Sequence, residues 1–251
     1  RSGGWTWGDW GENKDMTLLF NLWYVIALKG YEEMNQLAGE AEEAAWARTT
    51  ADKLRKVFHR TFWNGKYYIS PGYQGKPDDR AQALAVVSGV LPKELYPVIR
   101  PFFSTWYHAS PYMEKYVLEA LCTMGYYQDA LNRMKLRYRA MIESSLTTLW
   151  EGWGIGSEGF GGGTYNHAWS GGPLTILSQY IAGIETLEPA FRTFRVAPHP
   201  AHLNFIRTQV PLSGGRRIVF EMDKSAHSGT MYLRVPEGTS AQVVLPAEFQ
   251  R

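Results

Sequence analysis

The chain has 251 residues, of which 45% are hydrophobic, so it can build one large domain or two smaller ones around a real core. Its 26 basic and 24 acidic residues are well mixed and give a formal net charge of +2, which provides no electrostatic footprint for nucleic acid or for an anionic membrane surface. No run of about 18 apolar residues is present for a membrane span, and the single cysteine, Cys122, excludes an internal disulfide framework while leaving the cellular compartment open.

The aromatic content is the unusual part of the composition. Aromatic residues make up 14% of the chain, with 10 Trp and 15 Tyr, and many of them stand beside Gly, Asp, Glu or Asn instead of inside apolar runs. Aromatic faces next to polar groups suit carbohydrate, because sugar C–H faces pack on the ring while the hydroxyls form hydrogen bonds at its edge. A bulky aromatic core explains the same composition equally well.

The N-terminal part predicts a loop followed by a helical hairpin. Residues 1–15 are rich in Gly, Trp and acids and have no periodicity. The segment 16–38 is apolar on nearly every side, which predicts a helix that is buried on most of its surface and capped by Asp15 or Asn13. In the segment 41–62 apolar residues recur at spacings of three and four, as expected for an amphipathic outer helix that packs on a buried inner one.

The same pairing of helices continues along the chain. A loop over 64–77, with room for a hairpin, precedes further helices predicted at 79–89, 93–106, 110–124, 128–143 and 172–184. Ser110 is the expected N-cap of its helix, with Pro111 at the first helical position. A long Gly-rich loop, 144–171, separates the last two helices. About seven helices arranged as successive αα-hairpins indicate part of an α/α toroid.

After Pro189 the apolar residues alternate with a period of two, which is typical of half-buried strands. Ser213-Gly214-Gly215 and Pro236-Glu237-Gly238 are the expected hairpin turns. We therefore expect a mainly α chain with two domains: a partial α/α barrel over residues 1–187 and a small antiparallel β domain of about five strands over 188–251.

The densest group of chemistry-bearing residues lies in the Gly-rich loop. Glu151 stands between Trp150 and Trp153, an arrangement that can orient the carboxylate, partly desolvate it and raise its basicity. The nearby Gly161–Gly163 run lets the backbone approach a ligand, and His167, just ahead of a helix, can hydrogen-bond a hydroxyl. The alternative interpretation is a solvated surface glutamate and an incidental loop histidine.

Several motifs together resemble the bacterial α-L-rhamnosidases, a family of six-hairpin glycosidases. The similarity covers nearly the whole chain and is carried by Gly8-Asp9-Trp10, by 110–121 (Ser-Pro-Tyr-Met-Glu-Lys-Tyr-Val-Leu-Glu-Ala-Leu), by 148–153 (Thr-Leu-Trp-Glu-Gly-Trp), by 166–172 (Asn-His-Ala-Trp-Ser-Gly-Gly), by 181–184 (Ile-Ala-Gly-Ile) and by 194–198 (Phe-Arg-Val-Ala-Pro). Each motif is only moderately specific, but their order and spacing are hard to obtain by chance.

The resemblance implies a fold, a reaction and residue roles. It implies the C-terminal part of an α/α barrel, hydrolysis of terminal α-L-rhamnosides with inversion, and no cofactor. Inversion needs a carboxylic acid and a carboxylate base, typically about 6.5–9.5 Å apart. Glu151 matches the family's general base, His167 a sugar-contacting histidine and Trp10 a sugar-stacking tryptophan. The family's general acid lies in an acidic segment well upstream of the Gly-Asp-Trp element, so we expect this chain to be a fragment that lacks it.

Further acidic residues remain as candidates for substrate binding. Asp9, with Glu12 and Asp15, forms an acidic cluster at the expected sugar end, and Glu114 lies in the first turn of a helix whose N-terminus faces the pocket if that helix is an inner one. The alternative for all of them is a helix N-terminal acid favoured by the macrodipole. The same holds for Asp78 and Asp79, one of which Arg80 can hold in an ion pair. The histidines have no metal-ligand spacing, so no metal site is expected.

Two rival functions stay open: a six-hairpin glycosidase acting on another sugar, and a carbohydrate-binding or structural module without turnover. The expected partner is a rhamnose-containing glycan or glycoside. Because half a ring leaves apolar surface uncovered, we also expect the chain to form a homodimer.

Overall fold

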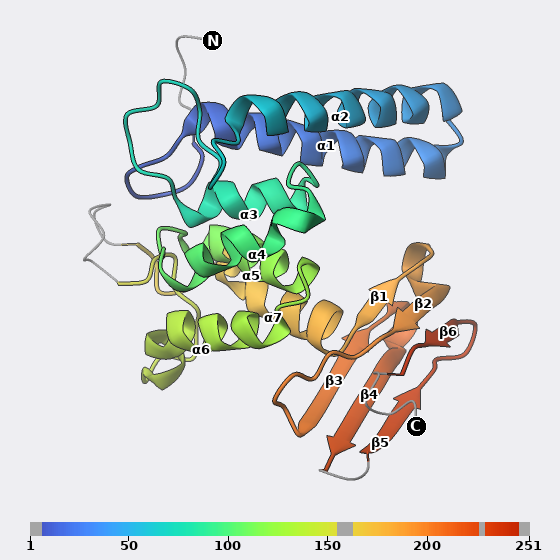
Figure 1. Cartoon of the computed structure of the whole chain (residues 1–251). Coiled ribbons are helices and arrows are strands. Elements are labelled where there is room, and N and C mark those ends of the chain that lie inside the picture. Colours follow the sequence, from blue (N-terminus) through green and yellow to red (C-terminus); the bar gives the residue numbers. More distant parts are fainter. Residues whose placement is uncertain (1–6, 155–162, 226–228, 246–251) are drawn as a thin grey trace. The chain divides into compact units, whose positions relative to one another are not determined.

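The computed structural model describes residues 7–154, 163–225 and 229–245. The chain forms two compact units (Figure 1), a helical unit made of Arg1–Tyr126 with Arg133–Ser170, and a second unit made of Tyr127–Asn132 with Gly171–Arg251. None of the helices in these described segments is both long enough and apolar enough to cross a membrane.

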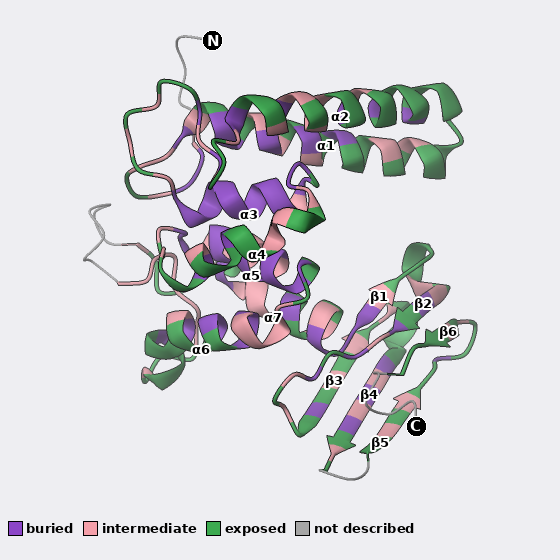
Figure 2. Ribbon diagram, viewed as in Figure 1, coloured by how far each residue is buried: buried purple, intermediate pink, exposed green. Residues whose placement is uncertain are grey.

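The helical unit begins with an antiparallel hairpin of α1 (Met16–Ala38) and α2 (Ala41–Phe62). Asp15 caps α1, as expected, because its carboxylate accepts a hydrogen bond of 3.0 Å from the backbone N–H of Leu18. The turn passes through Gly39 at φ 82°, a left-handed conformation that favours glycine. Both predicted helices are confirmed to the residue at their starts, and α2 buries one apolar face (Figure 2).

The expected burial of α1 on most sides is wrong. Its buried face consists of Leu18, Leu19, Leu22, Val25 and Leu28. The opposite face is open, and Phe20, Tyr24 and Tyr31 are 44%, 48% and 43% exposed. The residues of both faces are largely apolar, but nothing among the described residues covers the second face.

The remaining helices of this unit are α3 (Asp79–Val87), α4 (Tyr96–Ile99), α5 (Pro111–Thr123) and α6 (Tyr127–Glu143), except that the first part of α6, Tyr127–Asn132, belongs to the second unit. The single helix predicted over 93–106 is replaced by three short pieces, in which 3-10 turns η1 (Lys93–Leu95) and η2 (Arg100–Ser104) flank α4. The cause is Pro97 and Pro101, which lack the N–H that a continuous α-helix needs. Cys122 is buried in α5, as predicted, and burial raises the pKa of its thiol to about 12.

The last predicted helix, 172–184, ends early. A 3-10 turn, η3 (Ala168–Gly171), precedes α7 (Gly172–Ile176) and the π-helical turn η4 (Leu177–Ile181), after which the chain enters strand β1 (Ile184–Thr186). Gly183 makes the change of direction at φ 70°, and a Cβ there would collide with the backbone carbonyl of Ala197. The helix therefore stops because Gly183 packs directly on another backbone segment.

The second unit contains two three-stranded sheets. One has the order β1–β2–β6, with β2 (Thr193–Val196) antiparallel to β1 and β6 (Ser240–Val243) parallel to β2. The other is an antiparallel meander of β3 (Phe205–Pro211), β4 (Arg217–Lys224) and β5 (Gly229–Arg234). Short 3-10 turns, η5 (Pro189–Phe191) and η6 (Ser213–Gly215), complete the unit.

This topology corrects two details of the prediction. The described part of the chain has six strands instead of about five, and one pair of them is parallel. The turn at Pro236–Gly238 is present, with the N–H of Thr239 bonded to the carbonyl of Pro236 at 3.2 Å, but it is not a hairpin because it leads from β5 in one sheet to β6 in the other. The expected turn at Ser213–Gly215 does connect two paired strands.

The core of the second unit is apolar. Alternate residues of β4, Ile218, Phe220 and Met222, are fully buried, which confirms the period-two pattern (Figure 2). They pack with Phe194 and Val196 of β2, with Leu131 of α6, and with three residues at the end of η4 and the start of β1: Ile181, Ala182 and Ile184. Leu131 thus belongs to this core although it lies more than 50 residues before the first strand.

Candidate active site

A cluster of aromatic side chains lies in the helical unit. Trp7 stacks on Trp169 with ring centroids 5.7 Å apart and an interplanar angle of 11°. Tyr112, at the start of α5, contacts both rings, at 5.3 Å from Trp7 and 5.7 Å from Trp169. Trp10 approaches Trp7 edge-on at 5.5 Å, and the His167 ring stacks on Trp169 at 4.0 Å. Segments far apart in the sequence thus meet to form one surface of ring faces, which we call the aromatic cluster.

Glu151 is attached to this cluster. The indole N–H of Trp169 donates to the backbone carbonyl of Glu151 at 3.0 Å. The Glu151 carboxylate accepts two hydrogen bonds from Thr164, from its backbone N–H at 2.9 Å and from its hydroxyl at 3.1 Å. The N–H of Glu151 in turn donates to the carbonyl of Thr164 at 2.9 Å. The two sides of the Gly-rich loop are therefore pinned together at Glu151, with the carboxylate half-exposed.

The expected rise in the basicity of Glu151 is wrong. The pKa of this carboxyl lies below its ordinary value, chiefly because the backbone N–H of Thr164 stabilises the charged form. Desolvation acts in the opposite direction but is outweighed, and the Thr164 hydroxyl and the nearby His167 lower the pKa further. Sequence reasoning considered only the flanking tryptophans and missed the donor across the loop.

The two tryptophans beside Glu151 have different surroundings. The indole N–H of Trp153 donates to the carbonyl of Ala109 at 2.7 Å, its ring meets Tyr138 edge-on at 4.9 Å, and the Arg137 guanidinium lies 4.1 Å above it. Trp153 is therefore held firmly within the unit. The Trp150 ring contacts Tyr165 at 6.2 Å, and its buried indole N–H has no hydrogen-bond partner among the described residues.

Asp9 is fully buried and saturated by protein partners. Its carboxylate accepts hydrogen bonds from the N–H of Ser110 at 3.0 Å, from the Ser110 hydroxyl, and from the guanidinium of Arg80 at 3.3 Å. Arg80 also pairs with Asp78 at 2.9 Å, which confirms the expected ion pair. Burial raises the pKa of Asp9 above its ordinary value, and the hydrogen bonds and Arg80 oppose that rise. The structure brings Asp9 close to the aromatic segment, but no carboxylate oxygen is left over for a ligand in this conformation.

Glu114 is buried in the same way. Its two oxygens accept hydrogen bonds of 2.6 and 2.9 Å from Arg133, and Arg137 lies 3.6 Å away. Arg133 joins this glutamate to Asp79 at 2.5 Å. Glu114 therefore takes part in an internal ion network. Of the acids named from the sequence, Glu151 is the one that combines partial exposure with contact to the aromatic cluster.

Sequence reasoning did not single out Trp7, Tyr112, Thr164 or Trp169. Tyr112 and Trp169 stood inside the quoted motifs and Trp7 one residue before the first of them, so the signal was present, but the pattern could not show which rings meet. Across the described segments, no group of three or more His, Cys, Asp or Glu side chains has a metal-binding arrangement.

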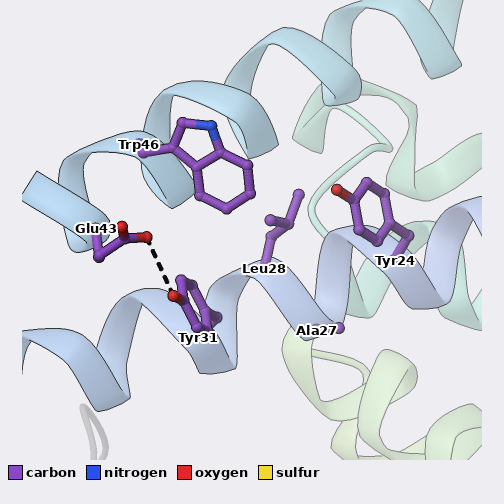
Figure 3. A pocket seen from close by; sticks show the side chains of 6 residues that line it. All are labelled: Tyr24, Ala27, Leu28, Tyr31, Glu43 and Trp46. Carbon is purple, nitrogen blue, oxygen red and sulfur yellow. Dashed lines mark hydrogen bonds between the residues drawn. The ribbon is translucent and has the colours of Figure 1, made fainter.

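A separate hollow of about 510 Å³ lies between side chains of α1 and α2 (Figure 3). It is lined by Tyr24, Ala27, Leu28, Tyr31, Glu43 and Trp46. The Tyr31 hydroxyl donates to Glu43 at 3.1 Å, which raises the pKa of Tyr31. None of the predicted site residues lies here, and the hollow shares no residue with the aromatic cluster.

The chain is similar in structure to several solved rhamnosidases. A family 78 rhamnosidase from Bacillus sp. GL1 is 25% identical with a TM-score of 0.81, covering 98% of this chain and 28% of its own length. The α-L-rhamnosidase of Dictyoglomus thermophilum is 20% identical with a TM-score of 0.80, over 99% of this chain and 30% of that one. The Streptomyces avermitilis enzyme, solved in complex with L-rhamnose, is 18% identical with a TM-score of 0.76, over 96% and 24%. The chain thus spans less than a third of these proteins.

Family models account for almost every residue. Residues 1–181 match the six-hairpin glycosidase domain of bacterial α-L-rhamnosidases, and residues 183–251 match the C-terminal domain of the same enzymes. No curated protein matches the chain in sequence. The expected fold class, a helical six-hairpin glycosidase segment followed by a small β domain, is confirmed. On this evidence the chain belongs to the bacterial α-L-rhamnosidase family.

Proposed function

We propose that this chain is the C-terminal part of an inverting glycoside hydrolase that acts on terminal α-L-rhamnosides, with Glu151 as the general base. The observation that carries the proposal is the half-exposed Glu151 carboxylate, tied through Trp169 to a cluster of four aromatic rings and His167. Ring faces of this kind suit the C–H face of a sugar, and an adjacent ionised carboxylate can take a proton from water.

The protonation state of Glu151 suits a base. Because its pKa is lowered by the Thr164 N–H, the side chain stays ionised at neutral pH and well into mildly acidic solution. An inverting enzyme also needs an acid that protonates the leaving oxygen, about 6.5–9.5 Å from the base. Asp9 and Glu114 do not fit that role, because both are enclosed by protein partners. We therefore propose that the acid comes from outside these 251 residues, which agrees with the share of the solved enzymes that the chain spans.

The sugar is proposed by analogy with a neighbour, since the Streptomyces avermitilis enzyme is described as a complex with L-rhamnose. His167 and Trp10 are the proposed sugar contacts, and Trp150, with its buried indole N–H, is a third. Trp153 fits better as a support, because its N–H already serves Ala109. A panel of aryl glycosides separates a rhamnosidase from a six-hairpin enzyme for another sugar: preferential release from the α-L-rhamnoside is expected.

The role of Glu151 is tested by Glu151→Gln in an enzyme that carries the whole barrel. Loss of general-base catalysis typically costs about 10²–10⁴-fold in kcat, while L-rhamnose binding should stay close to that of the wild type. Glu143→Gln is the control, because Glu143 is exposed and pairs only with Arg139 among the contacts described for it. A Glu151→Gln enzyme that kept more than about a tenth of its turnover would exclude Glu151 as the base.

The isolated chain should not cleave natural rhamnosides. Without an acid, unactivated leaving groups depart too slowly, whereas aryl rhamnosides need less assistance and can react slowly. Binding of L-rhamnose without product release would support the carbohydrate-binding alternative for this chain alone. Robust cleavage of a natural flavonoid rhamnoside would contradict the absence of the acid and direct attention to Asp9, Glu12 and Asp15.

We also propose that the isolated chain forms a two-fold dimer through α1. Its exposed apolar residues follow a 4-3-4-3 spacing: Phe20, Tyr24, Ala27, Tyr31 and Met34. The stripe is nearly symmetric about Ala27, because Phe20 and Met34 lie seven residues before and after it, and Tyr24 and Tyr31 lie three before and four after it. An antiparallel copy would place the small alanines together at the crossing, as isologous interfaces require. The hollow over Ala27 in Figure 3 gives room for a partner side chain.

Light scattering at micromolar concentration tests the dimer. The wild-type chain should have twice its monomer mass, and Ala27→Glu should be monomeric because it places two carboxylates against each other at the crossing. Lys29→Glu is the control, since it adds the same side chain on an exposed position outside the stripe. A wild-type monomer, or equal dissociation by both variants, would overturn the proposal.

A further inference from the structure

Three consecutive residues, His108–Ser110, connect the two separate segments that carry the candidate site. On one side is the Trp7–Trp10 segment of the aromatic cluster. Both the backbone N–H and the hydroxyl of Ser110 donate to the buried carboxylate of Asp9, which lies between the two tryptophans. Ser110 also precedes α5, whose Tyr112 packs on Trp7 at 5.3 Å.

The other side of the same three residues holds the Glu151 segment. The carbonyl of Ala109 accepts the indole N–H of Trp153 at 2.7 Å and the guanidinium of Arg137 at 2.6 Å. The N–H groups of His108 and Ala109 both donate to Asp79, at 3.1 and 3.2 Å. The backbone of this short segment is thus hydrogen-bonded on both of its edges, and every one of these partners belongs to the helical unit.

From these contacts we propose that His108–Ser110 is a positioning junction. In this proposal Ser110 is a positioning residue that holds the Trp7–Trp10 segment in its place relative to the segment that carries Glu151. The consequence for sugar binding rests on the proposed function, whereas the junction itself rests on the contacts alone. Ser110 touches no ligand in this scheme, because its hydroxyl and N–H both serve Asp9.

The backbone of Asp9 explains why a junction is needed. Asp9 has φ 135°, a conformation that side-chain-bearing residues rarely adopt and that persists only where the surroundings impose it. The restraints are the Ser110 bonds, Arg80 on the carboxylate and the Lys14 ammonium on the Asp9 carbonyl at 2.8 Å. Arg80 reinforces them by donating to the carbonyl of Trp10 at 2.8 Å and to that of Glu12 at 2.9 Å. Loss of the Ser110 hydroxyl removes one restraint and leaves the others in place.

The chain contains a matched control for this pair. Ser70 donates its N–H and its hydroxyl to the buried carboxylate of Asp15, at 2.6 and 2.7 Å, in the same manner as Ser110 donates to Asp9. Both serines are buried. Asp15, however, caps α1, and the hydrogen-bond partners described for it, Leu18, Leu19 and Ser70, lie outside the aromatic cluster. Ser110→Ala and Ser70→Ala therefore remove the same kind of bond, one inside the proposed junction and one outside it.

The experiment compares the full chain with Ser110→Ala, Ser70→Ala and Ser110→Thr. Urea unfolding reports stability, near-UV circular dichroism reports the packing of the tryptophan rings, and tryptophan fluorescence titration with L-rhamnose reports binding. We expect similar stability losses for the two alanine variants, but a changed near-UV spectrum and at least a tenfold weaker L-rhamnose affinity for Ser110→Ala alone. Ser110→Thr keeps the hydroxyl and should restore the spectrum and the affinity.

The results separate the two proposals. If Ser110→Ala and Ser70→Ala have the same near-UV spectrum and the same affinity, Ser110 is a structural residue and the junction is wrong. If the wild-type chain binds no L-rhamnose, the proposed sugar site of this chain fails, and the near-UV comparison decides on the junction by itself. A Ser110→Ala chain that is unfolded is replaced in the comparison by Asp9→Asn, which keeps the shape of the side chain and weakens the same bonds.

Discussion

The interiors of the two units are built from different kinds of residues. In the part of the chain that the structure describes, every buried polar or charged side chain belongs to the helical unit, including Asp9, Asp78, Asp79, Arg80, Glu114 and Arg133. The core of the second unit is apolar throughout its buried residues. Burying an ion pair rarely stabilises a protein more than apolar packing of the same volume. The charged side chains inside the helical unit hold loop backbone, for example the carbonyls of Trp10 and Glu12 through Arg80 and those of Phe103 and Trp106 through Arg133.

The largest effect should come from removing a charge from this interior. Arg133→Met removes the cation that pairs with Glu114 and Asp79 and removes its hydrogen bonds to the carbonyls of Phe103 and Trp106. Removing one member of a buried pair typically costs about 3–5 kcal/mol of unfolding free energy, which urea titration would measure. Arg139→Met is the control, because its pair with Glu143 is exposed and worth about 0–1 kcal/mol. Equal losses of unfolding free energy in the two variants would mean that the buried ion network stabilises the chain no more than an exposed pair does.

A smaller effect is expected in the apolar core. Ile218→Val removes one methylene from a fully buried position in β4 and should cost about 0.5–1.5 kcal/mol. The same change at Ile142, which is 73% exposed, should stay within about 0.5 kcal/mol. A loss above about 3 kcal/mol at Ile218 would contradict a core held by packing alone.

The smallest effect concerns pH. Burial raises the pKa of Asp78 and of Asp9 in the folded chain, so a proton binds there more readily than in the unfolded chain. The destabilisation is complete above the folded pKa and is relieved as the pH falls through it towards the ordinary value of 3.8. Wild type should therefore gain stability relative to Asp78→Asn as the pH is lowered from 7 to about 4. If the difference in unfolding free energy between wild type and Asp78→Asn stayed constant across this pH range, burial would not raise the pKa of Asp78.

Local patterns predicted most of the helices and singled out Glu151, the residue around which the candidate site is built. Long-range contacts account for what these patterns missed. The spacing of apolar residues gave α1, α2 and the buried face of β4, because periodicity reports the side of an element that faces a core. The hydrogen bonding of the buried Asp9 carboxylate depends on Ser110, about a hundred positions away, and the pKa of Glu151 depends on Thr164 across a loop. Neither partner is identifiable from spacing, since many residues offer the same donor.

The boundaries of helices failed for a similar reason. Pro97 and Pro101 are visible in the sequence, and their missing N–H groups account for the break in the helix predicted over 93–106. Gly183 is different. A residue with a Cβ does not fit there because the carbonyl of Ala197 is too close, and only the folded chain brings that carbonyl near. The domain boundary that we placed after residue 187 remains a prediction.

The position of Leu131 in the apolar core affects how the C-terminal β domain can be moved into another protein. The two family models meet between residues 181 and 183, which invites recombination at that seam. A gene fragment cut there would carry the strands but leave behind Leu131, and it would also sever the bond from the N–H of His199 to the carbonyl of Ile181 at 2.9 Å. The boundary between the two family models therefore does not coincide with that of the compact unit, which also contains Tyr127–Asn132 of α6. We expect that a graft of the β domain needs this piece of α6 to complete its core.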